Sequence, residues 1–180
     1  MLEVIVIVAV VMAIAIVIVL ALALTKPDTF SVRRSAVVRA SAERIFPLVN
    51  NFQEWVNWSP WENRDPAMKR SYSGAESGKG AVYAWDGNKN VGSGRMEILD
   101  ASSPSKITIK LDFFKPFEGH NTAEFTFAPD RGAAATNIVW VMHGPSSFMS
   151  KVMQVLMNLD AMIGRDFEAG LANLKKLTEP

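Results

Sequence analysis

The sequence contains no cysteine and only two histidines among its 180 residues. The absence of cysteine excludes disulfide bonds and thiolate ligands, although it does not identify a cellular compartment. The histidines, His120 and His143, are not spaced as in a His-Glu-x-x-His zinc motif. Strand alternation places His120 on the solvent side or at a strand end. We therefore predict neither a metal site nor a cofactor.

The short motifs of several enzyme classes are also missing. Gly87, Gly92 and Gly94 do not follow the Gly-x-Gly-x-x-Gly spacing, and no Gly-x-Ser-x-Gly sequence is present. Glu62 and Asp65 lie in a segment rich in turn residues, where solvated or capping carboxylates are expected. These features argue against dinucleotide dehydrogenases, lipases and kinases, and they assign no catalytic residue.

The chain carries little excess charge of either sign. Its formal net charge is only +1 at pH 7. Nucleic-acid-binding domains need a basic patch or stripe to neutralise phosphates, and no such excess is present. We therefore predict that nucleic acid is not a partner.

Residues 4–24, by contrast, form one unbroken apolar run. At 1.5 Å per residue the run spans roughly the 30 Å hydrocarbon core of a bilayer. A cleaved signal peptide is the alternative, but Glu3 precedes the run without any Lys or Arg, and a signal peptide has only about 7–15 apolar residues. We predict a transmembrane anchor over residues 1–25, a linker over 26–29 and one domain over 30–180.

Basic residues follow this run and none precedes it. Lys26, Arg33 and Arg34 are the nearest. Under the positive-inside rule, basic residues beside a span stay in the cytoplasm. The expected protein is therefore a single-pass membrane protein with its soluble domain in the cytoplasm.

The rest of the chain reads as strands and helices in a fixed order. Residues 30–40 suggest a strand, and two short helices follow, the first with Ser41 as its N-cap. Residues 67–143 then alternate in polarity between Gly and Asp/Asn turns, as in residues 106–114, and indicate about six antiparallel strands. One strand pair is expected to turn around residues 86–88.

A long C-terminal helix completes this order. After an N-cap at Ser146 or Ser147, apolar residues recur at steps of three or four from Phe148 to Leu174. The pattern predicts one continuous helix of about eight turns, since 3.6 residues make a turn. Its apolar stripe needs a large partner, and the apolar face of the sheet is the one available.

The order of elements resembles the START/Bet v 1-like (SRPBCC) superfamily, and more narrowly its membrane-anchored polyketide cyclase/dehydrase-like proteins. The resembling segments are RIFPLVNNFQEWVNWSPWENRDPAMKRSYSG, GNKNVGSGRMEI, KLDFFKPFEGHNTAEFTF and DFEAGLANLKKL. The resemblance covers about residues 30–177. It implies an α+β helix-grip fold, in which a curved antiparallel sheet wraps around the long C-terminal helix and a cavity lies between them.

Large apolar side chains are expected to line that cavity. Strand parity points one apolar set toward the helix, with Asn121 as its polar member, and the helix adds methionines that include Met149 and Met162. In the segment WVNWSPW, Pro60 is expected to turn the chain so that Trp61 points toward the opening of the sheet. The predicted ligand-binding residues are Trp58, Trp61, Tyr83, Trp85, Met96, Phe113, Asn121, Phe125, Trp140, Met142, Met153 and Met157.

These residues suggest a membrane-tethered protein that binds a hydrophobic or amphipathic small molecule of the lipid, quinone or isoprenoid class. Two alternatives stay open. The first is a polyketide cyclase- or dehydratase-like enzyme, for which strand parity offers Asn121, Tyr83 and His143 as polar groups. The second is a protein-interaction module, which would have a tightly filled core and no ligand.

Overall fold

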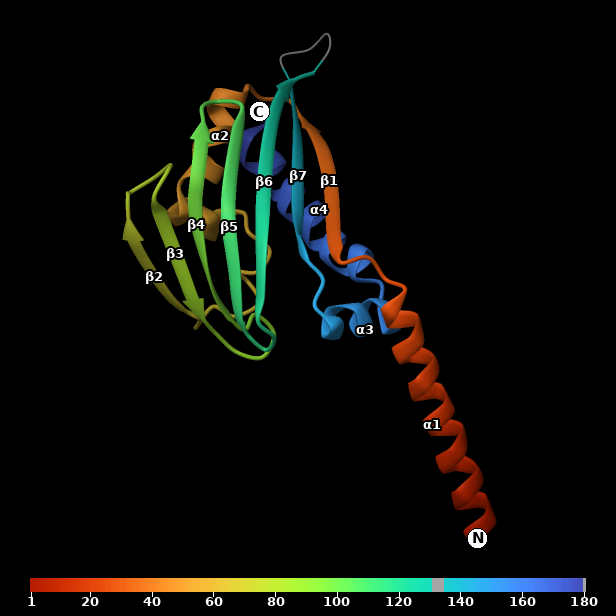
Figure 1. Ribbon diagram of the computed structural model, residues 1–180. Helices are drawn as coiled ribbons and strands as arrows, with labels where there is room; N and C mark the ends of the chain where they lie inside the picture. The colour runs from red at the N-terminus through yellow and green to blue at the C-terminus, as the bar shows by residue number, and fades with distance from the viewer. Residues whose placement is uncertain (131–134, 180) are drawn as a thin grey trace.

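The structure is a computed structural model that describes residues 1–130 and 135–179. The predicted domain boundary at residue 180 lies outside the described residues. Figure 1 shows a long N-terminal helix that projects from a curved sheet with a second long helix across one face. The helical elements are α1 (Leu2–Leu24), α2 (Ala42–Asn50), the 3-10 helix η1 (Phe52–Asn57), α3 (Phe148–Leu156) and α4 (Leu159–Thr178).

The described residues form one seven-stranded antiparallel sheet in the order β1-β7-β6-β5-β4-β3-β2. The first strand therefore pairs with the last, and β7, apolar on both sides, lies between β1 and β6. The predicted turn joins β3 to β4. The strands are β1 (Thr29–Val38), β2 (Lys69–Gly74), β3 (Ala81–Asp86), β4 (Ser93–Ser102), β5 (Lys106–Lys115), β6 (Gly119–Pro129) and β7 (Thr136–Pro145).

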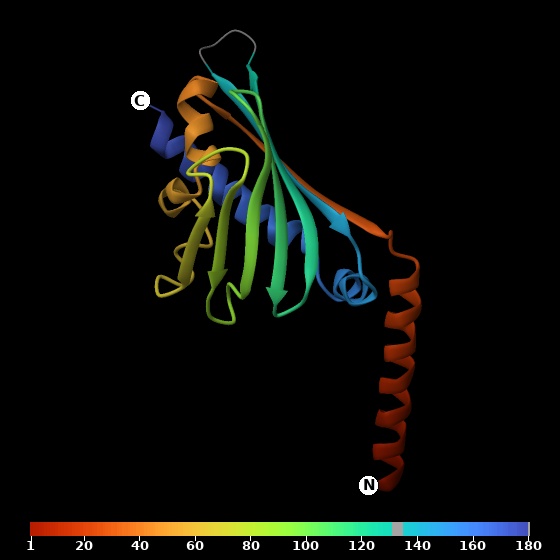
Figure 2. The same ribbon diagram turned by 60° about the vertical axis from the view of Figure 1, so that its left-hand side comes forward.

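The core lies between the sheet and α4, which crosses the concave face in both views (Figures 1 and 2). Inward residues of β4, β5 and β6 are buried because strand alternation turns them all to this face. Phe167, Leu171 and Leu174 of α4 cover them. The arrangement is the α+β helix-grip fold that the sequence predicts.

The prediction of one continuous C-terminal helix is wrong. It breaks between α3 and α4, because the Asn158 side chain accepts a hydrogen bond from the Ala161 N–H (2.9 Å) and caps a new helix. Ser147, one of the two expected N-caps, begins α3 by accepting from the Ser150 N–H (3.2 Å). The three-to-four spacing continues through the break, so periodicity alone did not reveal it.

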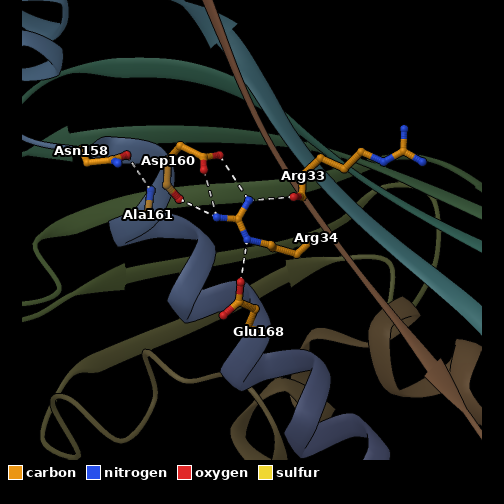
Figure 3. A network of polar contacts seen from close by, with 6 residues as sticks. All are labelled: Arg33, Arg34, Asn158, Asp160, Ala161 and Glu168. Atoms are coloured by element: carbon orange, nitrogen blue, oxygen red, sulfur yellow. Dashed lines mark hydrogen bonds and ion pairs between the residues drawn. The ribbon is translucent and has the colours of Figure 1, made fainter.

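An arginine of the sheet fixes the first turns of α4 (Figure 3). Arg34 of β1 donates from Nε to Glu168 (2.7 Å) and from Nη2 to both the carboxylate and the carbonyl oxygen of Asp160 (3.0 Å each). The guanidinium lies against Gly164, where an added Cβ would be 1.8 Å from Nη2. Gly164 therefore permits the close approach that ties α4 to β1.

The two ends of the domain differ in what lies there. We call the end at which α1 leaves the anchor end; α3 and the β3–β4 and β5–β6 connections lie there in both views (Figures 1 and 2). We call the opposite end, with α2 and the last turns of α4, the distal end. The 23-residue α1 is long and apolar enough to cross a membrane by length and composition, with a mean hydropathy of 3.6.

Candidate ligand-binding site

Aromatic side chains fill the centre of the interface between the sheet and α4. The Trp140 ring of β7 stacks on Phe167 of α4 with centroids 4.0 Å apart, and it contacts Phe125 (4.6 Å) and Trp58 (5.7 Å). Gly170 makes room for this packing, because a Cβ there would lie 2.9 Å from Trp140 Cζ3. The centre is thus apolar and closely packed, and among the described residues the cavity expected between the sheet and α4 is not found at this place.

Trp140 differs from the other buried tryptophans in its hydrogen bonding. Trp55 Nε1 donates to Val49 O (3.0 Å), and Trp58 Nε1 donates to Leu48 O (2.9 Å). The Trp140 Nε1–H is buried and has no acceptor among the described residues. A buried donor without a partner costs about 1–3 kcal/mol. The interface therefore holds one strong donor that its own side chains do not satisfy.

Trp61 lies at the edge of this aromatic group. It follows Pro60 outside any helix or strand and is partly exposed. Its ring packs edge-on against Trp140 (centroids 5.8 Å apart) and Phe167 (6.3 Å). The side chain therefore does turn back toward the sheet, and it separates Trp140 from solvent.

Apart from Trp61, the predicted ligand-binding residues fall into three groups. Trp58, Phe125 and Trp140 are in the packed centre. Others lie on the concave face around it, fully or partly buried. This second group consists of Tyr83, Trp85, Met96, Phe113, Asn121 and Met142.

The third group, Met153 and Met157, was predicted to face the sheet, and for Met157 this prediction is wrong. Met153 of α3 is partly buried, but Met157 is exposed at the end of α3. Met149 and Met162 are exposed as well. The break lets α3 turn away from the sheet, so Met149 and Met157 do not face it. Met162 belongs to α4 and lies on the exposed side of that helix, so its expected place in the cavity is also wrong.

Asn121 lies on the concave face, as strand parity predicts. It is opposite Leu111 in the β5–β6 register and is partly exposed. Its Oδ1 occupies the space beside Gly144, where a Cβ would be 2.2 Å away. His143 is exposed and pairs with Ser31 on the outer face, so it does not join Asn121 and Tyr83.

Glu62 is buried, which corrects the expectation of a solvated carboxylate. It accepts a hydrogen bond from the Tyr83 hydroxyl (2.7 Å) and pairs with Arg70 Nε (2.7 Å). Burial and the Glu62 carboxylate raise the pKa of Tyr83, so its hydroxyl stays protonated and donates. No periodic pattern could have revealed the burial of Glu62, because residue 62 lies in a loop. Asp65 is also buried and accepts a hydrogen bond from the Asn88 N–H of the β3–β4 connection (2.7 Å).

Two surface pockets lie away from the packed centre. One, of about 240 Å³, is bounded by η1, β2 and β3 and includes Phe52 and Tyr72. The other, of about 430 Å³, is at the anchor end of β2–β5 and includes Trp85 and Phe114. Among the described residues, no cluster of three or more His, Asp or Glu side chains is arranged to hold a metal ion.

Solved structures with the same fold are numerous but distant in sequence. A protein from Chromobacterium violaceum is 15% identical, with 86% of this chain and 99% of that chain covered and a TM-score of 0.59. The di-domain ARO/CYC BexL of the BE-7585A biosynthetic pathway is 16% identical, with 89% and 53% covered and a TM-score of 0.62. The Aha1 dimer from Colwellia psychrerythraea is 12% identical, with 83% and 96% covered and a TM-score of 0.59.

At these identities the structures establish the fold alone. No curated protein matches the chain. The sequence profile described as "Polyketide cyclase / dehydrase and lipid transport" matches residues 29–179, which is nearly the whole domain after α1. The chain belongs to the polyketide cyclase/dehydrase and lipid transport family.

Proposed function

We propose that this protein is a membrane-tethered binding protein for an apolar or amphipathic small molecule of the lipid, quinone or isoprenoid class, held between the sheet and α4. The family description, which joins cyclases to lipid transport, supports a hydrophobic ligand. The observation that carries the proposal is the buried Trp140 Nε1–H without an acceptor. A ligand oxygen would complete this hydrogen bond.

The surroundings of Trp140 restrict the ligand's chemistry. Aromatic rings of Trp58, Phe125 and Phe167 surround the indole, so the body of the ligand must be apolar. The donor calls for an accepting oxygen attached to that body, such as a quinone or ester carbonyl. An apolar pocket with a few placed polar groups is the usual form of a small-molecule site.

Trp61 is the side chain that a ligand would displace. The interface is closed in this structure, so binding requires a rearrangement. Trp61 is partly exposed, lies in a loop and covers Trp140, whereas Trp58 and Phe125 are fully enclosed. Moving Trp61 therefore disturbs the packed centre least.

The apolar helix α1 supports the proposal that the protein is tethered to a membrane. A span held in the bilayer keeps the domain close to ligands that partition there and raises their effective concentration. We also propose that the domain faces the cytoplasm, because Lys26, Arg33 and Arg34 follow α1. Accessibility of a label on the domain in sealed cells tests this orientation.

Mass spectrometry of molecules extracted from the purified full chain tests the proposal, with Trp140→Phe and Trp55→Phe as matched variants. Both remove an indole N–H from a buried ring, but only Trp55 has a protein acceptor. We expect Trp140→Phe to lose most of the bound molecule and Trp55→Phe to retain it. Wild-type protein that carries no apolar molecule, or equal retention by both variants, would overturn the proposal.

A cyclase- or dehydratase-like activity is the second candidate, and the Glu62–Tyr83 pair favours it. A buried carboxylate 2.7 Å from a phenol on the concave side could hold and move a proton. Arg70 occupies the other carboxylate oxygen, which also suits a structural role. Glu62→Gln should abolish turnover of a linear polyketide thioester if the pair is catalytic. Unchanged turnover, or none in the wild type, would exclude this candidate.

A further inference from the structure

Helix α3 presents its apolar side to the outside and its polar side to the protein. Lys151 is only 13% exposed, whereas Met149 is 54% exposed and Leu156 61%. Phe148, which is 48% exposed, and Leu156 lie on the same side of α3, with the partly buried Val152 between them at steps of four. A helix on a water-soluble domain has the opposite arrangement. The outward side of α3 is therefore made to contact something apolar.

The inward polar side is held by specific contacts. Lys151 Nζ binds the Asp28 carboxylate (2.5 Å), and Gln154 Nε2 donates to Ser146 Oγ (3.1 Å). The Lys151 hydrogen bond lowers the pKa of Asp28. Because Asp28 belongs to the linker between α1 and β1, these contacts fix α3 beside the exit of α1.

The position of α3 along α1 sets its depth relative to the apolar span. The two helices contact one another, and on α1 the burial falls on Val19, which is partly buried, and Ala23, which is fully buried. Val19 is five residues before the end of α1, about 7.5 Å along a helix that rises 1.5 Å per residue. Interfacial amphipathic helices insert to about 5–10 Å. The depths agree.

The last residues of β5 and the β5–β6 connection add apolar side chains at the same end of the domain. Phe114 and Phe117 are both more than half exposed. This connection and α3 lie at the anchor end in both views (Figures 1 and 2). Two elements separated by some thirty residues of sequence thus carry exposed aromatic and aliphatic side chains to the end from which α1 leaves.

We infer that the anchor end is a membrane-docking surface, with Phe114, Phe117, Phe148, Met149 and Leu156 inserted into the headgroup layer. The bilayer is the partner because the surface is continuous with the apolar span of α1. The inference rests on the membrane span proposed above, but not on ligand binding. It places the domain against the bilayer rather than at the end of a flexible tether, so an apolar ligand would not need to cross water.

Spin labels on the full chain in phosphatidylcholine vesicles test the inference. The absence of native cysteine permits single-cysteine variants without further changes. The test positions are Met149→Cys, Leu156→Cys and Phe117→Cys. The matched control is Leu177→Cys near the distal end of α4, which is 46% exposed. Ile14→Cys reports on the span itself. Collisions with oxygen and with a water-soluble nickel complex are measured at each position.

We expect an oxygen-to-nickel accessibility ratio several-fold higher at the three test positions than at Leu177. Ratios equal to that at Leu177, with a high ratio at Ile14, would overturn docking while leaving the span intact. Low collision rates with both reagents and spin–spin broadening would instead assign the surface to a second copy of the chain and would also overturn the inference. None of these measurements depends on a bound ligand. Docking can therefore be disproved without affecting the test of ligand binding with Trp140→Phe and Trp55→Phe.

Discussion

The distal and anchor ends of this domain carry the same kinds of side chain with opposite exposure. At the distal end Ile45, Ile107 and Ile138 are fully buried between α2, the sheet and α4. At the anchor end Phe148 and Leu156 are about half exposed or more. These isoleucines are covered by the chain's own elements, whereas Phe148 and Leu156 are left uncovered. The uncovered end is where a bilayer is expected to replace protein.

The physical difference lies in the helix break. α4 follows the sheet only as far as Leu159, and the Asn158 cap lets the preceding nine residues take another direction. An unbroken helix would have carried Phe148 and Met149 along the axis of α4. The break therefore converts the start of a core helix into a surface helix.

The largest difference is expected between two phenylalanine truncations, one in the buried core and one on the exposed helix α3. Phe167→Ala removes a fully buried ring that stacks on Trp140, and such truncations cost about 3–5 kcal/mol. Phe148→Ala on α3 should change the free energy of unfolding by less than about 0.5 kcal/mol, as surface substitutions usually do. Denaturant titration of the full chain in detergent measures both. Similar losses would mean that α3 is part of the core.

Substitution of the helix glycine Gly170 should give an intermediate effect, and Gly164 on the same helix is its comparison. Gly170→Ala places a Cβ 2.9 Å from the rigid Trp140 ring, so the strain of overpacking should exceed the gain in helix propensity and destabilise the protein by about 1 kcal/mol. Gly164→Ala meets only the end of the flexible Arg34 side chain. The guanidinium would have to shift and weaken its hydrogen bonds to Asp160 and Glu168. Because both carboxylates are more than half exposed, these ion pairs contribute little, and the gain in helix propensity offsets the loss, so we expect little net change. Thermal unfolding compares the two, and a larger loss for Gly164→Ala would contradict this assignment.

The smallest effect concerns a charged contact at the anchor end. His120 Nδ1 lies 2.8 Å from Asp112 on the outer face, and this hydrogen bond raises the pKa of His120. Burial alone would raise the pKa of Asp112, but its hydrogen bonds with His120 and Lys110 lower it. The stabilisation from His120 is therefore fully present below its ordinary pKa of about 6.5 and lost as pH rises through the raised value.

The matched variant for this prediction is His120→Gln. The difference in unfolding free energy between wild type and variant should shrink from about pH 6 to about pH 9. Guanidinium titrations at the two pH values measure it. A difference that stays constant with pH, or grows, would show that His120 does not bind its proton more tightly in the folded state.

Much of the fold was predictable because it depends on periodicity. The alternation of Ile107, Ile109 and Leu111 identified the inner face of β5, and their burial confirms it. Trp61 was expected to point toward the opening of the sheet, and its ring packs against Trp140 of β7. Glu62 was not predicted as buried, because its environment comes from Tyr83 and Arg70, which are distant in sequence and only meet it in the folded chain.

The sequence by itself determined the apolar run of α1, the strands and the face that each strand buries, because these follow from the spacing of residues along the chain. Only the tertiary structure decided that Trp140 lacks an acceptor while Trp55 has one, and that α3 turns Lys151 inward and Leu156 outward. Hydrogen-bond partners and exposure depend on which elements meet, and spacing along the chain does not specify that.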